Sequence, residues 1–428
     1  MDYTTESQIK QVGYSENFGF QEKLLVPSGL LGFHNTETII EKAKSGRDVF
    51  VLLGEVSQHP SDIVCPKCGC KMHIHGSYPT CLRHLNFGGK LSCVSFNKSR
   101  YENYLDYIYS YYDRDYTPTD AEAFLADVRQ YLVPVADALY ARDPKLHLGY
   151  SDALDQVPVT LLGTAAEKMG GPVLEAYRFL AAYELYDLSP TPEKRDVSYM
   201  TYVAEYEAPI ILINPLKHPD VYDTLYHEFG HFVDSYVHCG SYDDLETAET
   251  FSQAMVYLAL ANSALPENVK AKALRMALTE LLLERIIERS TYADFEQRVY
   301  TMDPAELSLE KLDAIYEQCC LDDGHRVPYP EGVRPLRWVR DDFFFDSPGY
   351  VISYPCSAVA SLQICQKEAE KPSDGVAAFC RLLNYADGWY SFQYALPAAG
   401  LKNPFAQKNK TNPLVEIAAF LKEALELP

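Results

Sequence analysis

The sequence predicts a mainly α-helical protein with a small α/β or zinc-ribbon-like region at its start. After residue 119, apolar residues recur at helical spacing along most of the chain. Within that part, one segment has the composition of a convincing strand. Before it, residues 65–100 are rich in Cys, His and Gly. We therefore expect an N-terminal region over residues 1–100 and a helical domain over residues 101–428.

The first helix that the sequence predicts follows Thr119 or Asp120, either of which can cap it. Its apolar side chains recur every three or four residues up to Leu132. Residues 208–214 form the predicted strand, which could be a sheet edge that pairs with a peptide or simply part of the core. Helical spacing predicts the remaining helices over roughly 171–187, 221–238, 244–262, 266–288, 290–302, 307–320, 350–370 and 413–426.

Composition and charge restrict the classes of function. The formal net charge of −22 arises after residue 100, whereas the first hundred residues are slightly basic. The acidic domain is a poor partner for nucleic acid, because phosphate contacts need Lys and Arg. The chain has no long apolar run and no secretory signal pattern, so we expect no membrane segment and a cytoplasmic location. There the eleven cysteines would be reduced thiols or metal ligands.

The most informative stretch is His227-Glu228-Phe229-Gly230-His231. Residues i and i+4 of a helix lie on one face, so both imidazoles can bind one metal ion. Glu228 would then lie beside a water molecule on that metal and could take its proton. The apolar flanks favour a buried helix, and Gly230 permits close approach of a neighbouring element. Two histidines packed in a core are the competing interpretation.

A catalytic zinc ion needs a third protein ligand and keeps a fourth position for water. Gly240 can end the motif helix, and residues 241–244 resemble a capping box that begins the next helix. In a simple helical hairpin the residue level with His231 is about 249, so we favour Glu249 as the third ligand. Glu246 would lie about 4.5 Å short along the helix axis. It stays open as an alternative ligand or as a partner of the ligands.

Further motifs on both sides of the histidines follow one order. They are residues 184–187, 209–214, 226–231, 246–255, 292–296 and 338–354. In this order they resemble the M3 family of zinc oligopeptidases, the thimet oligopeptidase and oligoendopeptidase F group. The resemblance implies a helical, zincin-like metallopeptidase domain of the gluzincin type over residues 101–428.

The resemblance also implies a set of site residues. The family's third ligand is a glutamate followed three positions later by serine, which here falls on Glu249 and Ser252. The family places tyrosines near the reacting carbonyl, and these correspond to Tyr350 and Tyr354 as catalytic residues. The resemblance further implies one catalytic Zn²⁺ and short peptides as substrates.

The chain departs from the family pattern in the parts that would hold a substrate. Phe343 stands where the family has a histidine before its tyrosines, and the segment between His231 and Glu249 is shorter than in typical members. A long N-terminal helical lobe is largely missing. The first rival to an active enzyme is therefore a catalytically impaired remnant of this family.

The N-terminal cysteines suggest a second metal site. Cys65 and Cys68 are two residues apart, a spacing at which two thiolates chelate one ion. The stretch from Cys65 to Gly89 resembles the N-terminal zinc ribbon of certain transposases, but the ribbon's second cysteine pair is absent. We expect a degenerate ribbon with weak or no metal affinity. Between Cys65 and Arg100 there are six basic residues and no acidic one, so nucleic-acid binding by this segment is the second rival.

The sequence as a whole predicts a zinc metalloendopeptidase that hydrolyses short peptides. In this interpretation His227, His231 and Glu249 hold the zinc ion, and Glu228 assists the attack of a zinc-bound water on the peptide bond.

Overall fold

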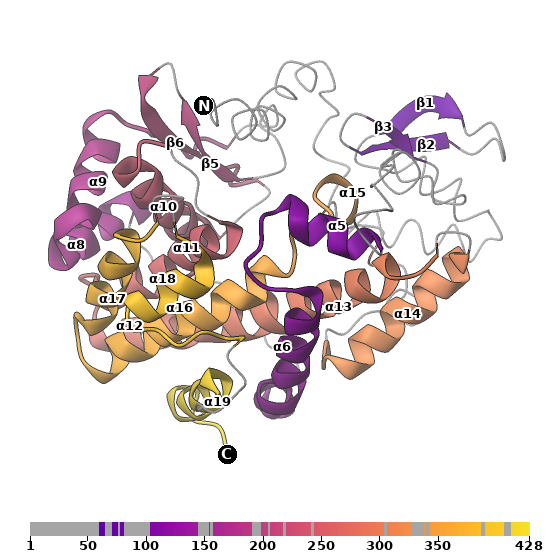
Figure 1. Cartoon of the computed structure of the whole chain (residues 1–428). Coiled ribbons are helices and arrows are strands. Elements are labelled where there is room, and N and C mark those ends of the chain that lie inside the picture. Colours follow the sequence, from indigo (N-terminus) through magenta and orange to yellow (C-terminus); the bar gives the residue numbers. More distant parts are fainter. Residues whose placement is uncertain are drawn as a thin grey trace.

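The computed structural model describes most of the chain from residue 103 onward and three strands before it (Figure 1). The described residues are 60–64, 71–75, 78–80, 103–143, 154, 157–190, 198–203, 206–216, 220–240, 244–303, 306–326, 338, 343–386, 390–405 and 412–428. The predicted boundary near residue 100 and the candidate second metal site at Cys65 and Cys68 lie outside them. Both stay predictions.

The three early strands form an antiparallel sheet in the order β1-β2-β3. Their bounds are Pro60–Val64, Lys71–His75 and Tyr78–Thr80.

Helices dominate the described residues, and the mainly α-helical prediction is confirmed. The first group is α5 (Tyr104–Tyr111), α6 (Pro118–Tyr131), α7 (Val133–Arg142), α8 (Pro158–Met169) and α9 (Gly171–Ala182). The predicted cap of α6 was wrong, because Thr117 caps this helix and Pro118 is its first residue. Asp120 instead completes a capping box, in which its carboxylate accepts the Thr117 N–H at 2.9 Å.

A small sheet lies beside the motif helix. Its strands are β4 (Tyr186–Asp187), β5 (Tyr199–Val203) and β6 (Ala208–Leu212), in the order β4-β6-β5. The predicted strand at 208–214 is therefore the central one, and the expectation that it could be a sheet edge was wrong. Among the described strands, β5 pairs with β6 alone and has one edge without a neighbouring strand.

The second group of helices builds the core around α11. These elements are α10 (Val221–Val237), α11 (Leu245–Asn262), α12 (Glu267–Glu280), the π-helix η4 (Leu281–Glu288), α13 (Arg289–Tyr300), α14 (Leu309–Asp322), α15 (Phe343–Asp346), α16 (Ser353–Glu370), α17 (Asp374–Leu383), α18 (Phe392–Ala398) and α19 (Pro413–Ala424). Helix α11 packs against both α10 and α16 and is buried along most of its length. Figure 1 shows α8, α9 and the sheet at one end of this core and α13 and α14 at the other.

Gly230 explains how closely α10 and α11 approach each other. A Cβ atom at this position would lie 2.5 Å from the Cα atom of Ser252 on α11, closer than real Cβ contacts come. Any larger residue would therefore separate the two helices. The predicted role of Gly230 in close approach is confirmed.

The turn between α10 and α11 also follows the sequence prediction. Gly240 adopts a left-handed φ of +75° just after α10 ends. Asp244 caps α11, and its carboxylate accepts the Thr247 N–H at 2.7 Å.

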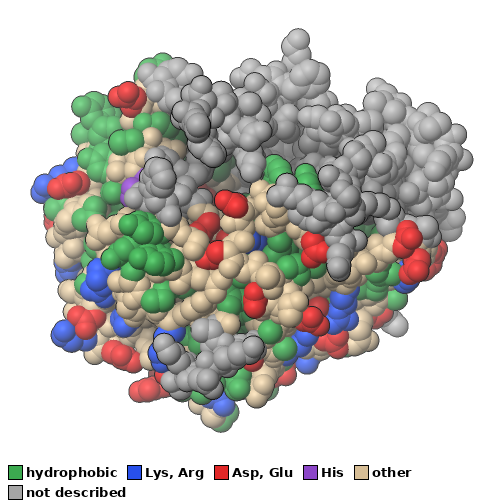
Figure 2. All heavy atoms as spheres, in the orientation of Figure 1, with side chains coloured by type: hydrophobic (Ala, Val, Ile, Leu, Met, Phe, Trp, Pro, Cys, Tyr) green, Lys and Arg blue, Asp and Glu red, His purple; other side chains and the backbone are tan. Residues whose placement is uncertain are grey.

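Acidic side chains are spread over the face in Figure 2, and its described residues show no continuous basic patch there. Among the described residues, no helix is both long and apolar enough to cross a membrane.

Candidate metal centre

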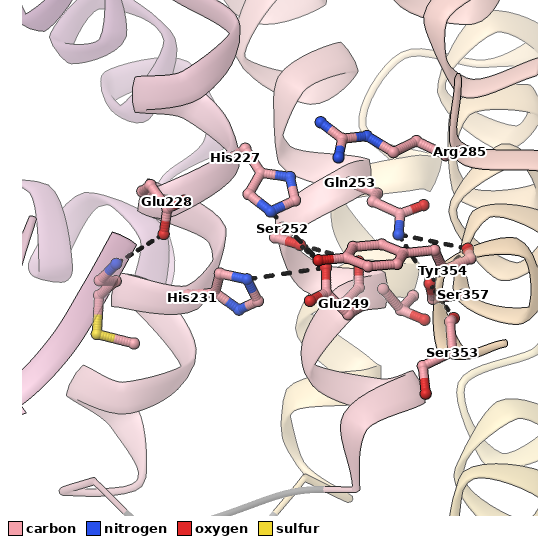
Figure 3. A network of polar contacts seen from close by, with 12 residues as sticks. His227, Glu228, His231, Glu249, Ser252, Gln253, Arg285, Ser353, Tyr354 and Ser357 are labelled. Carbon is pink, nitrogen blue, oxygen red and sulfur yellow. Dashed lines mark hydrogen bonds and ion pairs between the residues drawn. The ribbon is translucent and has the colours of Figure 1, made fainter. Parts of the chain in front are cut away.

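Helix α10 presents two histidines toward a glutamate of α11. Nε2 of His227 lies 3.7 Å from Oε2 of Glu249, and Nε2 of His231 lies 3.9 Å from the same oxygen. Figure 3 shows all three side chains converging on one point between the helices. Their ligand atoms lie within 4.8 Å of one another, and they form the one such group of His, Cys, Asp and Glu in the part of the chain that the structure describes.

The spacing and chemistry of this group fit a zinc ion. Tetrahedral ligands about 2.0–2.2 Å from zinc lie about 3.4 Å from one another, close to the separations between these side chains. Burial, with the nearby Arg285 cation, holds the pKa of His227 well below its usual range. The imidazole is therefore neutral, which leaves a lone pair available for a metal.

The carboxylate of Glu249 is fixed by two hydroxyl groups. Tyr350 donates a hydrogen bond to Oε1 at 2.7 Å, and Ser252 donates one to Oε2 at 3.2 Å. The side chain of Glu249 is 4 % exposed. Support of this kind orients a candidate ligand before any ion arrives.

Glu228 lies on the same helix but turns toward the sheet. Its Oε2 accepts the backbone N–H of Met200 at 2.7 Å (Figure 3). Met200 belongs to β5, so this contact joins the motif helix to the small sheet. Burial raises the pKa of Glu228 to about 7, and the charge on Glu249 adds to the rise.

Glu246 lies away from the histidines, in a different set of contacts. Its Oε1 accepts hydrogen bonds from Arg114 Nε at 3.0 Å, the Tyr116 hydroxyl at 2.5 Å and the Ser353 hydroxyl at 2.8 Å. It is absent from the His227, His231 and Glu249 group. The sequence left two glutamates open as the third metal ligand. In the structure Glu249 lies beside the histidines, and Glu246 accepts a hydrogen bond from Arg114.

The two predicted tyrosines reach the site from α16 and the turn before it. Tyr350 contacts Glu249 directly, whereas the Tyr354 hydroxyl has no hydrogen bond to any residue that the structure describes. Figure 3 shows the Tyr354 ring extending toward Glu249 and the histidines. Phe343 stacks on Tyr350 with ring centroids 5.3 Å apart and meets the edge of Tyr354 at 5.7 Å. Phe343 thus puts an apolar ring beside both tyrosines, at the position where the family has a histidine.

Several residues near the site carry no signal in the sequence. Gln253 of α11 donates to the Ser357 hydroxyl at 2.8 Å and so ties α11 to α16. Arg289 lies 5.3 Å from the ring centroid of Tyr354 and 5.4 Å from that of Phe343. Met200 acts through its backbone, which no side-chain pattern can reveal. It lies on β5, a strand that the sequence did not predict.

Residues 174–354 match the model of peptidase family M3. Over these residues the chain is similar to peptidase family M3. The match includes the motif helix, Glu249, Tyr350 and Tyr354, and it confirms the family that the sequence resembles. Arg114 and Tyr116 lie outside the M3 match. No curated protein matches the sequence significantly.

Solved structures share the M3-type fold. PZ peptidase A with an inhibitor has a TM-score of 0.65 and 20% identity, covering 76% of this chain and 62% of that one. An oligoendopeptidase F has a TM-score of 0.65 and 19% identity, covering 77% and 62%. A protein from Bacillus anthracis str. Ames described as an oligoendopeptidase F has a TM-score of 0.61 and 21% identity, covering 77% and 60%. The chain thus spans about three fifths of the length of these structures.

Proposed function

We propose that the chain is a zinc-dependent endopeptidase that cleaves short peptides. The observation that carries the proposal is the convergence of His227, His231 and Glu249 on one point, with the carboxylate of Glu228 on the same helix. The M3 match supports a peptidase, and the names of the similar structures support short peptides as substrates.

In this proposal His227, His231 and Glu249 hold the zinc ion. Zinc, when bound, acts as a Lewis acid that polarises water and the peptide carbonyl. The neutral state of His227 and the two hydroxyl groups on Glu249 suit both residues to this role.

Glu228 is the proposed general base. It would take a proton from the attacking water and deliver it to the leaving amine. The Met200 N–H engages Oε2 of this carboxylate. The contact fixes the orientation of the side chain, so that Oε1 can face the water.

The two tyrosines take different roles in this proposal. Tyr354 is the proposed donor to the oxyanion that develops on the peptide carbonyl, because its hydroxyl is directed toward the site and has no other partner among the described residues. Tyr350 already donates to Glu249. Its proposed role is to hold that carboxylate in place for the metal.

The edge of β5 that has no neighbouring strand among the described residues is the proposed binding surface for the substrate backbone. An extended peptide can add to a sheet edge through main-chain hydrogen bonds. The Met200 contact places this edge directly beside Glu228. A peptide paired there would pass close to the candidate base.

The test is hydrolysis of a set of internally quenched peptides by the purified full chain. We expect cleavage within the peptides, its loss with a zinc chelator, and its return on addition of Zn²⁺. Cleavage that the chelator leaves unchanged would contradict the proposal. Bound zinc without cleavage of any peptide would instead identify a catalytically impaired domain.

A further inference from the structure

Arg114 is a fully buried cation that the proposed mechanism does not use. Its side chain is 0 % exposed, and it follows α5, outside the M3 match. Its Nε donates to Glu246 at 3.0 Å, and one terminal nitrogen donates to both the Gly349 carbonyl at 2.8 Å and the Ser353 hydroxyl at 2.9 Å. One guanidinium therefore contacts the metal-ligand helix α11 and both ends of the Gly349–Ser353 segment.

Glu246 completes this contact from the other side. Its Oε1 accepts from Arg114, Tyr116 and Ser353, so the carboxylate and the guanidinium share Ser353 as a common partner. Glu246 is 2 % exposed and lies one turn before Glu249 on α11. We call Arg114 and Glu246 together the clasp.

The clasp binds the Gly349–Ser353 segment, and Gly349 at its start is also fixed by a second contact. Gly349 has a left-handed φ of +79°, and its N–H donates to Oε1 of Glu296 at 2.7 Å. A Cβ atom there would collide with Ile108 of α5. Both polar backbone groups of Gly349 are thus bound, and the next residue is Tyr350.

We propose that Arg114 and Glu246 are positioning residues that set Tyr350 and Tyr354 relative to Glu249. The inference rests on the proposed function, because it concerns the residues that would hold the metal-ligand carboxylate and the oxyanion.

A purely structural role explains the clasp less well. A buried ion pair contributes little to stability once its desolvation is counted, and replacing both charges together is often neutral. The hydrogen bonds of Arg114 to Gly349 and Ser353 bracket the turn that carries Tyr350. A displacement of about 1 Å in such a group is enough to slow a reaction about a hundredfold.

The experiment uses the double variant Arg114→Gln with Glu246→Gln in the full chain. It removes both charges together, so neither remains buried without its partner. The new amide at 246 can still accept from Tyr116 and Ser353, whereas the shorter side chain at 114 loses its reach to Gly349. At saturating zinc we expect kcat to fall about tenfold to a hundredfold, with KM and melting temperature close to those of the wild type.

Arg114→Lys and Arg129→Met are the matched comparisons. Arg114→Lys keeps the charge opposite Glu246 but loses the forked hydrogen bonds, so we expect an intermediate kcat. Arg129 pairs with Asp294 and Asp323, and none of its hydrogen bonds or ion pairs among the described residues is to residues 349–354. Arg129→Met should lower the melting temperature and leave kcat unchanged. A double variant with wild-type kcat at saturating zinc would overturn the inference.

Amide hydrogen exchange separates this inference from the proposed function. In the double variant we expect faster exchange in residues 349–354, with exchange in α10 unchanged. If the zinc-loaded wild type cleaves no peptide, the proposed function fails, and the exchange data still test the clasp. Unchanged exchange in 349–354 would overturn it.

Discussion

Tyr350 donates a hydrogen bond to Oε1 of Glu249 over 2.7 Å, while Oε2 of the same carboxylate faces His227 and His231 at 3.7 and 3.9 Å. One oxygen is thus occupied by the tyrosine, and the other is directed to the candidate metal position. Tyr354 lies beside them, with its hydroxyl not engaged by any described residue. The two tyrosines therefore differ in what their hydroxyl groups do before substrate binds.

Removing each tyrosine hydroxyl should give a different defect. Tyr350→Phe frees Oε1 of Glu249, so we expect zinc affinity to fall about tenfold to a hundredfold. Tyr354→Phe removes the proposed oxyanion donor, so we expect kcat to fall about a hundredfold with zinc affinity unchanged. Competition with a chelator measures the first effect, and peptide hydrolysis at saturating zinc measures the second. The same defect in both variants would refute this division of roles.

Gly230→Ala should weaken both the fold and the metal centre. The added methyl group would lie 2.5 Å from the Cα atom of Ser252. This atom belongs to the backbone, which cannot rotate away as a side chain can. We expect the free energy of unfolding to fall by about 1–3 kcal/mol in urea titrations. Zinc affinity should fall as well, because α10 and α11 carry the candidate ligands.

Gly163→Ala is the control for this overpacking. The Cβ atom there would meet the hydroxyl end of the Tyr177 side chain, which can rotate away. We expect a smaller loss of stability and unchanged zinc affinity. A Gly230→Ala variant as stable as Gly163→Ala would show that α10 and α11 can separate at little cost.

His238 should make the stability depend on pH. Both ring nitrogens face acceptors, Asp234 Oδ1 at 2.8 Å and the Leu383 carbonyl at 3.0 Å, and the doubly protonated ring satisfies both. Burial opposes the charge, but the hydrogen bond and the charge of Asp234 outweigh it and raise the pKa of His238 above 6.5. The stabilisation is therefore fully present below the unfolded-state pKa and is lost as the pH rises through the folded-state pKa.

The comparison of wild type with His238→Gln measures this effect. In urea titrations we expect the wild type to gain about 1 kcal/mol over the variant near about pH 5.5 and to lose that advantage by about pH 8.5. Asp234→Asn should abolish the same pH dependence. An advantage that grows with rising pH would contradict the assignment.

Local spacing made much of the candidate site predictable. His227 and His231 share a face because they are one helical turn apart, and Gly230 is small because the next helix contacts it. The turn at Gly240 and the cap at Asp244 set the register of the hairpin, which is why Glu249 could be placed level with His231. All of these residues lie between positions 227 and 249 of the sequence.

The remaining parts of the site depend on long-range contacts. Arg114 donates hydrogen bonds to Glu246 and Gly349, each more than a hundred residues further along the sequence. No periodic pattern in a sequence predicts such a contact. Helix α5 was missed because its tyrosines are poor helix formers, and it is stabilised by packing against α13. The short strand β5 was missed because its order comes from pairing with β6.

The most direct test of the proposed mechanism compares peptide hydrolysis by zinc-loaded wild type and Glu228→Gln at equal zinc content. Glu228 is the proposed base and is not one of the three candidate ligands, so the variant should bind zinc as the wild type does. We expect its kcat to fall about a thousandfold. Equal hydrolysis by the two proteins at the same zinc content would contradict it.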